Sequence, residues 1–116
     1  MSTDNLNELD WRMNFDKRVE IVELAKSKKL NFERVDRYEI PSRLMPFPYL
    51  QSESVDVVYW PEKSITVKFL VDAGLLDNSS SFVYTDNPEE IKKYDKLVSE
   101  SSIDYKKAKN WYFVKE

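Results

Sequence analysis

The segment from residue 54 to residue 76 (SVDVVYWPEKSITVKFLVDAGLL) constrains the fold of this chain more than any other. Apolar side chains occupy every second position from Val55 to Tyr59 and again from Ile65 to Val71. Such period-two runs of β-branched and aromatic residues are typical of strands that bury one face. Pro61 separates the two runs, and its fixed φ suits the second position of a type I turn. The segment therefore predicts a central hairpin over residues 54–72.

A helix over residues 64–76 is the alternative interpretation of the second run. Ile65, Phe69 and Leu76 would then share one helical face. However, residues 65–67 are β-branched and stiff at χ1, which disfavours a helix, so we expect a strand. Gly74 is the single glycine of the chain and marks the expected end of this element, because glycine reaches positive φ at little cost.

Two helices are expected to flank the sheet, over about residues 14–29 and 88–100. In the first, an apolar stripe at helical spacing faces the core, and Asn14 is the expected N-cap. In the second, Asn87 is the expected N-cap and Pro88 the first helical residue, where its missing N–H does no harm.

The rest of the chain predicts further strands and one unusual loop. Residues 32–40 are interpreted as a single charged edge strand, 82–85 as a short strand and 110–115 as the last strand. Residues 41–50 are rich in both proline and apolar side chains, so they predict a loop. This loop could either cover the core as a strap or present an exposed contact surface.

Together these elements predict one α+β domain over residues 1–116, with a flexible N-terminal segment at residues 1–9. The expected architecture is a small, mainly antiparallel sheet of about four to five strands around the central hairpin, flanked by the two helices.

The sequence contains no histidine and no cysteine. These absences remove the commonest general base, the Ser–His and Cys–His nucleophile pairs, and thiolate metal sites. We therefore expect no catalytic residues, no metal site and no cofactor, and hence a protein that is not an enzyme. No apolar run is long enough to cross a membrane, and the N-terminus lacks the pattern of a signal peptide. The expected location is the cytoplasm, with which the lack of cysteine agrees.

One pair of residues weakly suggests chemistry. Asp56 and Lys68 lie on the two expected strands of the central hairpin, an arrangement loosely similar to the carboxylate-and-lysine core of metal-dependent nucleases. Thr66 stands where a second carboxylate belongs, which leaves a magnesium ion short of a ligand. A cross-strand ion pair on a solvated face of the hairpin explains the two residues better.

The leading functional hypothesis is a non-enzymatic protein-binding module, such as a small inhibitor, an immunity-type protein or an adaptor. Aromatic residues make up 14% of the chain, and residues 30–85 carry eight acids against five bases. Aromatic and arginine anchors are typical of interfaces, and an acidic region suits a partner with a basic surface. Small inhibitors and immunity-type proteins, including phage-encoded ones, share this general composition. The candidate partner-binding residues are Arg43, Phe47, Tyr49, Asp56, Trp60 and Glu62.

The alternative hypothesis is a nucleic-acid-associated accessory protein that uses the last third of the chain. Basic and aromatic residues interleave there, as they do in proteins that bind single strands. The candidate nucleic-acid-binding residues are Lys92, Lys93, Lys106, Lys107, Lys109 and Trp111. Neighbouring acids, among them Glu89, Glu90 and Asp95, offset the local positive charge and make this hypothesis the weaker one.

Overall fold

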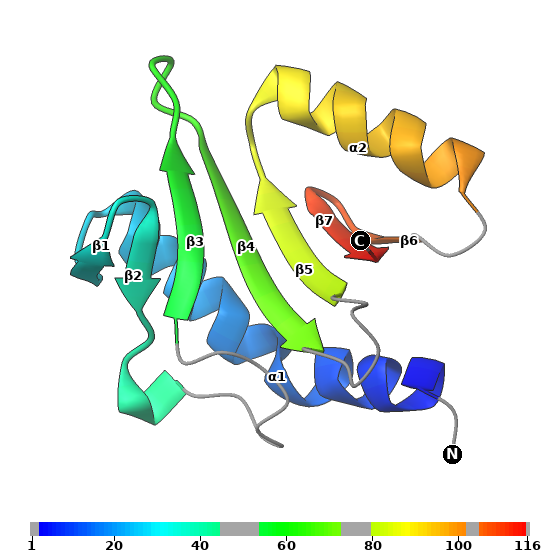
Figure 1. Cartoon of the computed structure of the whole chain (residues 1–116), viewed down its shortest axis with the longest axis horizontal. Helices are drawn as coiled ribbons and strands as arrows, with labels where there is room; N and C mark the ends of the chain where they lie inside the picture. The colour runs from blue at the N-terminus through cyan, green and yellow to red at the C-terminus, as the bar shows by residue number, and fades with distance from the viewer. Residues whose placement is uncertain (1–2, 45–53, 73–79, 102–104, 116) are drawn as a thin grey trace.

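The computed structural model describes residues 3–44, 54–72, 80–101 and 105–115. Within these residues the chain forms two helices and one seven-stranded antiparallel sheet, which confirms the α+β class (Figure 1). The sheet has the strand order β1-β2-β3-β4-β5-β7-β6. The elements are α1 (Thr3–Lys26), β1 (Asn31–Arg34), β2 (Arg37–Glu39), the 3-10 helix η1 (Ser42–Leu44), β3 (Ser54–Tyr59), β4 (Ile65–Asp72), β5 (Ser80–Thr85), α2 (Pro88–Glu100), β6 (Tyr105–Ala108) and β7 (Trp111–Lys115).

The central hairpin is present as expected and is formed by β3 and β4. Asp56 lies opposite Lys68 in the register of the two strands. In the turn, Lys63 N–H donates to the Trp60 carbonyl over 3.0 Å, which places Pro61 at the second turn position. Lys63 itself has a φ of 68°. The helix alternative is wrong for residues 65–72, and Gly74 lies outside the described residues.

Helix α1 begins at Thr3 and so includes most of the segment expected to be flexible. Asn14 therefore lies inside the helix, where it is 1% exposed, and the prediction that it caps the N-terminus is wrong. At the other end, Lys28 has a φ of 59°, and the Lys29 N–H donates to the Leu24 carbonyl over 2.8 Å. This left-handed residue and its hydrogen bond form a Schellman-type C-cap, which ends the helix at Lys26.

Helix α2 starts where the sequence predicts. The Asn87 side chain accepts a hydrogen bond of 3.0 Å from the Glu90 N–H, and Pro88 is the first helical residue. This contact satisfies one of the backbone donors that every helix N-terminus leaves without a helical partner.

The sheet has seven strands rather than the four to five expected. Residues 32–40 do not form one strand, because Val35 and Asp36 make a tight turn between β1 and β2, with Asp36 at a φ of 64°. Likewise, β6 turns into β7 through Lys109 and Asn110, and Asn110 has a φ of 69°. Both turns use Asp or Asn instead of glycine, since these residues tolerate the left-handed region.

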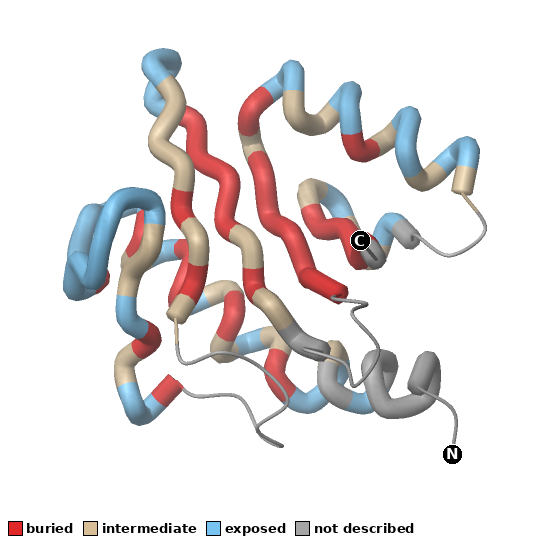
Figure 2. The backbone as a smooth tube through the Cα atoms, viewed as in Figure 1, coloured by how far each residue is buried: buried red, intermediate tan, exposed pale blue. Residues whose placement is uncertain are grey.

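The two faces of the sheet are covered to different extents. Helix α1 packs on one face, here called the inner face, and α2 packs over part of the opposite, outer face (Figure 1). Figure 2 shows that β5 is buried along its whole length, whereas the β1–β2 hairpin is largely exposed. The inner core contains Ile21, Val22 and Ala25 of α1 with Val55, Val57, Ile65, Val67, Phe69 and Phe82 of the strands. The outer core is smaller and contains Val83, Tyr94, Tyr112 and Val114, with Val98 packed against it.

Candidate functional site

The outer face of the sheet holds a groove where α2 stops covering it. The groove has a volume of about 430 Å³ and lies between the β1–β2 turn and the first turns of α2. We call it the open groove. It is lined by Arg34, Val35, Asp36, Arg37, Asp56, Val58, Thr66, Lys68, Glu90, Lys93 and Tyr94.

Strand alternation builds the floor of the open groove. Successive side chains point to opposite faces, so the neighbours of the core residues Val57 and Val67 face outward. Asp56 lies opposite both Arg37 of β2 and Lys68 of β4 in the register. The Arg37 Nε lies 3.2 Å from the Asp56 Oδ1, and both side chains remain partly exposed, at 31% and 44%.

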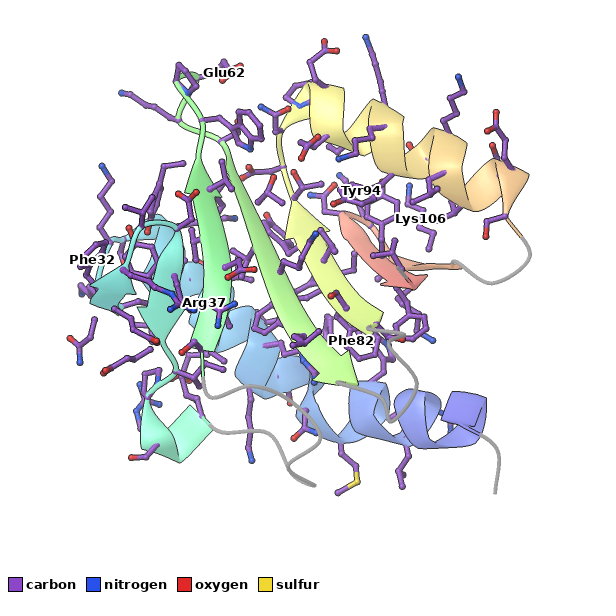
Figure 3. The ribbon with its side chains drawn as sticks, viewed as in Figure 1. Phe32, Arg37, Glu62, Phe82, Tyr94 and Lys106 are labelled. Atoms are coloured by element: carbon purple, nitrogen blue, oxygen red, sulfur yellow. The ribbon has the colours of Figure 1, made fainter. Side chains whose placement is uncertain are left out.

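The walls of the open groove come from the β1–β2 turn and from α2. On the turn, Val35 is 81% exposed. On α2, Lys93 Nζ lies 3.8 Å from Glu90 Oε2, and Tyr94 is buried and stacks on Tyr112 with ring centroids 5.3 Å apart. Figure 3 shows Arg37 on the β2 side of this face and Tyr94 on the α2 side.

The structure places Asp56 and Lys68 side by side but gives Thr66 another role. The Thr66 hydroxyl oxygen lies 2.9 Å from that of Thr85 and accepts a hydrogen bond of 3.0 Å from Trp60 Nε1. Among the residues that the structure describes, no three potential metal ligands of the His, Cys, Asp or Glu type come together. Asp56 forms an ion pair with Arg37, across the β2–β3 pair.

Of the partner-binding residues expected from the sequence, those that the structure describes lie in separate parts of the molecule. Asp56 alone lines the open groove, and Glu62 lies exposed at the tip of the β3–β4 turn (Figure 3). Arg43 lies on η1, where its guanidinium pairs with Glu20 of α1. Arg43 also lines a second hollow of about 550 Å³ at that end of the molecule. Phe47 and Tyr49 lie outside the described residues.

Trp60 takes part in a buried polar network and is not an exposed anchor residue. Its indole N–H donates to Thr66, whose hydroxyl meets that of Thr85. The Thr85 hydroxyl also accepts from the Asn87 N–H over 3.2 Å, and the Asn87 side-chain amide donates to Ser64 Oγ over 2.9 Å. The half-buried Trp60 therefore connects the hairpin to the start of α2.

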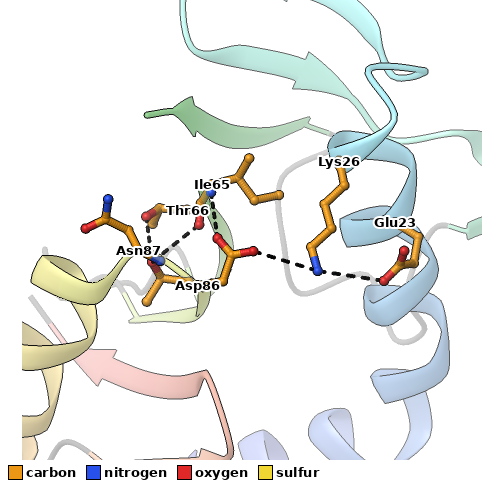
Figure 4. Close-up of polar contacts among 7 residues, drawn as sticks. Glu23, Lys26, Ile65, Thr66, Asp86 and Asn87 are labelled. Carbon is orange, nitrogen blue, oxygen red and sulfur yellow. Dashed lines mark hydrogen bonds and ion pairs between the residues drawn. The ribbon is translucent and has the colours of Figure 1, made fainter. Parts of the chain in front are cut away.

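Asp86 extends these contacts to α1 (Figure 4). Its Oδ1 accepts a hydrogen bond of 2.7 Å from the Ile65 N–H, and its Oδ2 lies 3.9 Å from Lys26 Nζ. A hydrogen bond to the Tyr84 side chain raises the pKa of Lys26 against the opposing effect of burial, and nearby Glu23 and Asp86 add to the rise. This junction joins α1, the hairpin and α2 and has a structural role.

The basic residues of the last third of the chain are divided between two faces. Lys106 Nζ lies 5.5 Å from the Tyr112 ring on the outer side, whereas Lys107 Nζ lies 5.7 Å from the Trp11 ring on the inner side. Lys92 and Lys93 pair with Glu89 and Glu90 at 4.0 Å and 3.8 Å, and Lys109 lies in the β6–β7 turn. Trp111 is 4% exposed within the inner core, so its ring offers no face on which a base could stack.

Lys106 takes part in one further cluster, beneath α2. The Tyr112 hydroxyl donates to Asp95 Oδ1 over 2.7 Å, and Lys106 Nζ donates to the same oxygen over 3.2 Å. These two hydrogen bonds, that from Tyr112 first, hold the pKa of Asp95 below its ordinary value. Burial, and then the Asp95 hydrogen bond, raise the pKa of Tyr112 well above its ordinary value. The cluster fixes α2 to the edge of the sheet.

Most residues of the open groove were not singled out from the sequence. The outward positions of β3 and β4 follow from their alternation, so Val58 could have been found that way, as Asp56 and Lys68 were. The wall formed by Arg34, Val35 and Asp36 could not have been predicted from the sequence. The turn that creates this wall contains no glycine or proline, the residues that usually indicate a turn.

Comparison with protein-family models, with curated proteins and with solved structures gave no match to this chain. In the described part of the chain, neither helix carries an apolar stretch long enough to cross a membrane.

Proposed function

We propose that this chain is a non-enzymatic protein-binding module, a small inhibitor, immunity-type or adaptor protein, and that the open groove and its rim form the contact surface. The observation that carries the proposal is the half-covered outer face of the sheet. Helix α2 packs over β5, β7 and β6 and leaves the outward side chains of β2, β3 and β4 at a groove. We further propose that the module acts in the cytoplasm, since a chain without cysteine suits a reducing compartment.

The composition of the groove supports protein contact. Interfaces combine a few apolar anchors with a rim of polar and charged groups. Here Val58 on the floor and Val35 on the rim provide apolar contact, while Arg37, Asp56 and Lys93 provide the charged surroundings. All three of these charged groups are already paired with protein side chains, Arg37 with Asp56 and Lys93 with Glu90. Such paired charges suit recognition better than proton transfer, which needs a group free to gain or lose a proton.

The proposal is tested by affinity capture from a lysate of the cells in which the protein naturally occurs, with nuclease added. The tagged chain should retain one stoichiometric protein, identified by mass spectrometry. Val35→Asp places a charge on the proposed rim, and we expect it to abolish retention. Val35 is 81% exposed in a turn, so the substitution leaves the fold intact, which circular dichroism verifies.

The matched control is Met13→Asp. Met13 is 49% exposed on α1, on the opposite side of the sheet, and should carry no partner contact. Retention that disappears on nuclease treatment, or that Met13→Asp abolishes while Val35→Asp leaves it unchanged, would refute the proposal.

A further inference from the structure

The two edges of the sheet are covered to different extents. In the strand order, β1 and β6 are the edge strands, and each has one neighbouring strand. At the β6 edge, Lys106 donates to Asp95 of α2 over 3.2 Å, so the helix is fixed to that strand. In contrast, all four residues of β1 are exposed, and Figures 1 and 2 show β1 at the outer side of the molecule, away from α2. An edge strand presents backbone N–H and C=O groups to which a further strand can pair, and β1 is the more accessible of the two edges.

Two exposed apolar side chains lie at the β1 edge. Phe32 on β1 is 64% exposed, and Val35 in the adjoining turn is 81% exposed. These are the two highest values among the large apolar side chains of the described residues. Phe32 also packs edge-on against Tyr38 of β2, with ring centroids 5.8 Å apart, and so extends the aromatic contacts of the sheet to its edge (Figure 3). Exposed apolar groups gathered beside an accessible strand edge are typical of a contact surface.

The residue order at this edge is complementary to itself. Residues 32–35 are apolar, acidic, basic and apolar in turn, namely Phe32, Glu33, Arg34 and Val35. In an antiparallel pair of two β1 strands with the two-fold axis between Glu33 and Arg34, Glu33 of each copy lies opposite Arg34 of the other. Phe32 then lies opposite Val35. Opposite charges directly across a strand pair stabilise it and like charges destabilise it, so the charges that usually keep edge strands apart are attractive in this register.

The two charged side chains lie on the same face of the sheet, as such a contact requires. Arg34 lines the open groove on the outer face. The Glu33 carboxylate accepts a hydrogen bond from Ser54 Oγ, and Ser54 stands two residues before the groove residue Asp56 on β3, so both point to the outer face. Glu33 is the extra residue of a bulge in β1, because the register with β2 passes from Phe32 to Arg34. A carboxylate that accepts from Ser54 has a second oxygen that can accept from an arginine of another copy.

We propose that two copies of this chain associate through β1, antiparallel, with Glu33 of each copy opposite Arg34 of the other. The two sheets then form one continuous sheet, and because the two-fold axis is perpendicular to it, both open grooves face the same side. A pair of four-residue strands buries a small area, so the dimer is weak, with a dissociation constant in the micromolar to millimolar range. The inference goes beyond the proposed binding function and does not rest on it, since it involves this chain alone.

The test measures the sedimentation velocity of the purified chain over a dilution series from millimolar to low micromolar protein. We expect a monomer–dimer equilibrium that shifts toward the monomer as salt screens the Glu33–Arg34 pairs. Arg34→Glu places two acids opposite each other, and Glu33→Arg places two bases opposite each other. Because the two-fold axis repeats each contact, either substitution should raise the dissociation constant of the dimer roughly tenfold or more.

Mixing the two variants tests the register itself. In a heterodimer of Arg34→Glu with Glu33→Arg, both contacts regain opposite charges, so the equimolar mixture should form dimers at concentrations at which each variant alone is monomeric. Both positions are exposed, and circular dichroism verifies that each variant is folded.

The matched controls are Lys96→Glu and Glu100→Arg, which make the same two changes in net charge at exposed positions of α2. Each should leave the dissociation constant of the dimer within error of that of the unsubstituted chain.

An unsubstituted chain that stays monomeric at millimolar concentration, a dimer that both β1 variants preserve, or two variants that stay monomeric when mixed would each overturn the inference. Growth beyond the dimer would also contradict it, since the two-fold contact uses the β1 edge of both copies. The capture experiment answers separately for the proposed function, because the sedimentation experiment contains no other protein.

Discussion

Asp95 is the residue at which the electrostatics of this protein are easiest to test. The Tyr112 hydroxyl donates to its Oδ1 over 2.7 Å and so stabilises the charged carboxylate. Tyr112→Phe removes that hydrogen bond and keeps the ring that stacks on Tyr94. We expect the pKa of Asp95 to rise toward its ordinary value of about 3.9, measured by NMR titration of the carboxyl carbon.

The direction of the pH dependence follows from the same shift. Because the folded-state pKa of Asp95 is lowered, its contribution to stability is present above the ordinary pKa and is lost as the pH falls through the folded-state value. Tyr112→Phe should therefore reduce the acid sensitivity that this one group confers. An unchanged Asp95 pKa in the variant would show that the hydrogen bond is not its cause.

Phe69 provides a test of the inner core. It is 0% exposed, its ring stacks on Trp111 with centroids 5.9 Å apart, and the Arg18 guanidinium carbon lies 5.7 Å from its centroid. Phe69→Ala should lower the free energy of unfolding by about 3–5 kcal/mol, through lost burial and the cavity left behind. Urea denaturation followed by circular dichroism measures the loss.

Phe32→Ala is the matched control, because it deletes the same atoms from a side chain that is 64% exposed. It should cost less than about 1 kcal/mol. Similar losses in the two variants would contradict the placement of the core on the inner face.

At the residue scale, the alternation of apolar residues correctly predicts which apolar side chains are buried, but it does not predict the burial of polar side chains. The inward positions of β3 and β4 follow directly from period-two spacing. Arg18 does not: it is 0% exposed, with its guanidinium carbon 4.6 Å from the Phe82 ring centroid. Its burial depends on aromatic side chains brought together from distant parts of the chain, which local spacing cannot indicate.

Among the elements, α2 depends most clearly on one cap. Asn87 accepts from the Glu90 N–H at the helix start and donates to Ser64 Oγ in the hairpin turn. Asn87→Ala removes both contacts and should cost roughly 1–3 kcal/mol of unfolding free energy. Thermal and urea denaturation measure this.

Ser99→Ala is the control for that substitution. The Ser99 hydroxyl donates to the Lys96 carbonyl over 2.8 Å near the exposed end of the same helix. Its loss should change stability by no more than about 0.5 kcal/mol. If both variants lost the same amount, the cap would not be the feature that anchors α2.

Turn chemistry decided which elements could be predicted. The β3–β4 turn and the start of α2 carry prolines at positions that proline favours, and both were predicted. The β1–β2 and β6–β7 turns instead place Asp36 and Asn110 at positive φ within charged segments. Without a glycine or proline signal, the first was interpreted as a continuous strand and the second was missed.

At the scale of the whole molecule, the helices cover the two faces of the sheet to different extents. Helix α1 covers the inner face, and α2 covers the β5–β7–β6 part of the outer face. The net charge of a sequence segment is a poor guide to the charge of the uncovered part of the outer face, because folding separates residues that are neighbours in the chain. Asp56 lines the open groove, whereas Glu62 lies at the hairpin tip and Arg43 at the second hollow.

The central claim, that partners bind at the open groove, is tested most directly by methyl NMR of the labelled chain with and without its captured protein. Val35 and Val58 report from the groove, and Met13 reports from the opposite side of the sheet. We expect the valine methyl signals to shift on binding while the Met13 methyl signal stays in place. A shifted Met13 signal with unchanged Val35 and Val58 signals would contradict the claim and place the interface on α1.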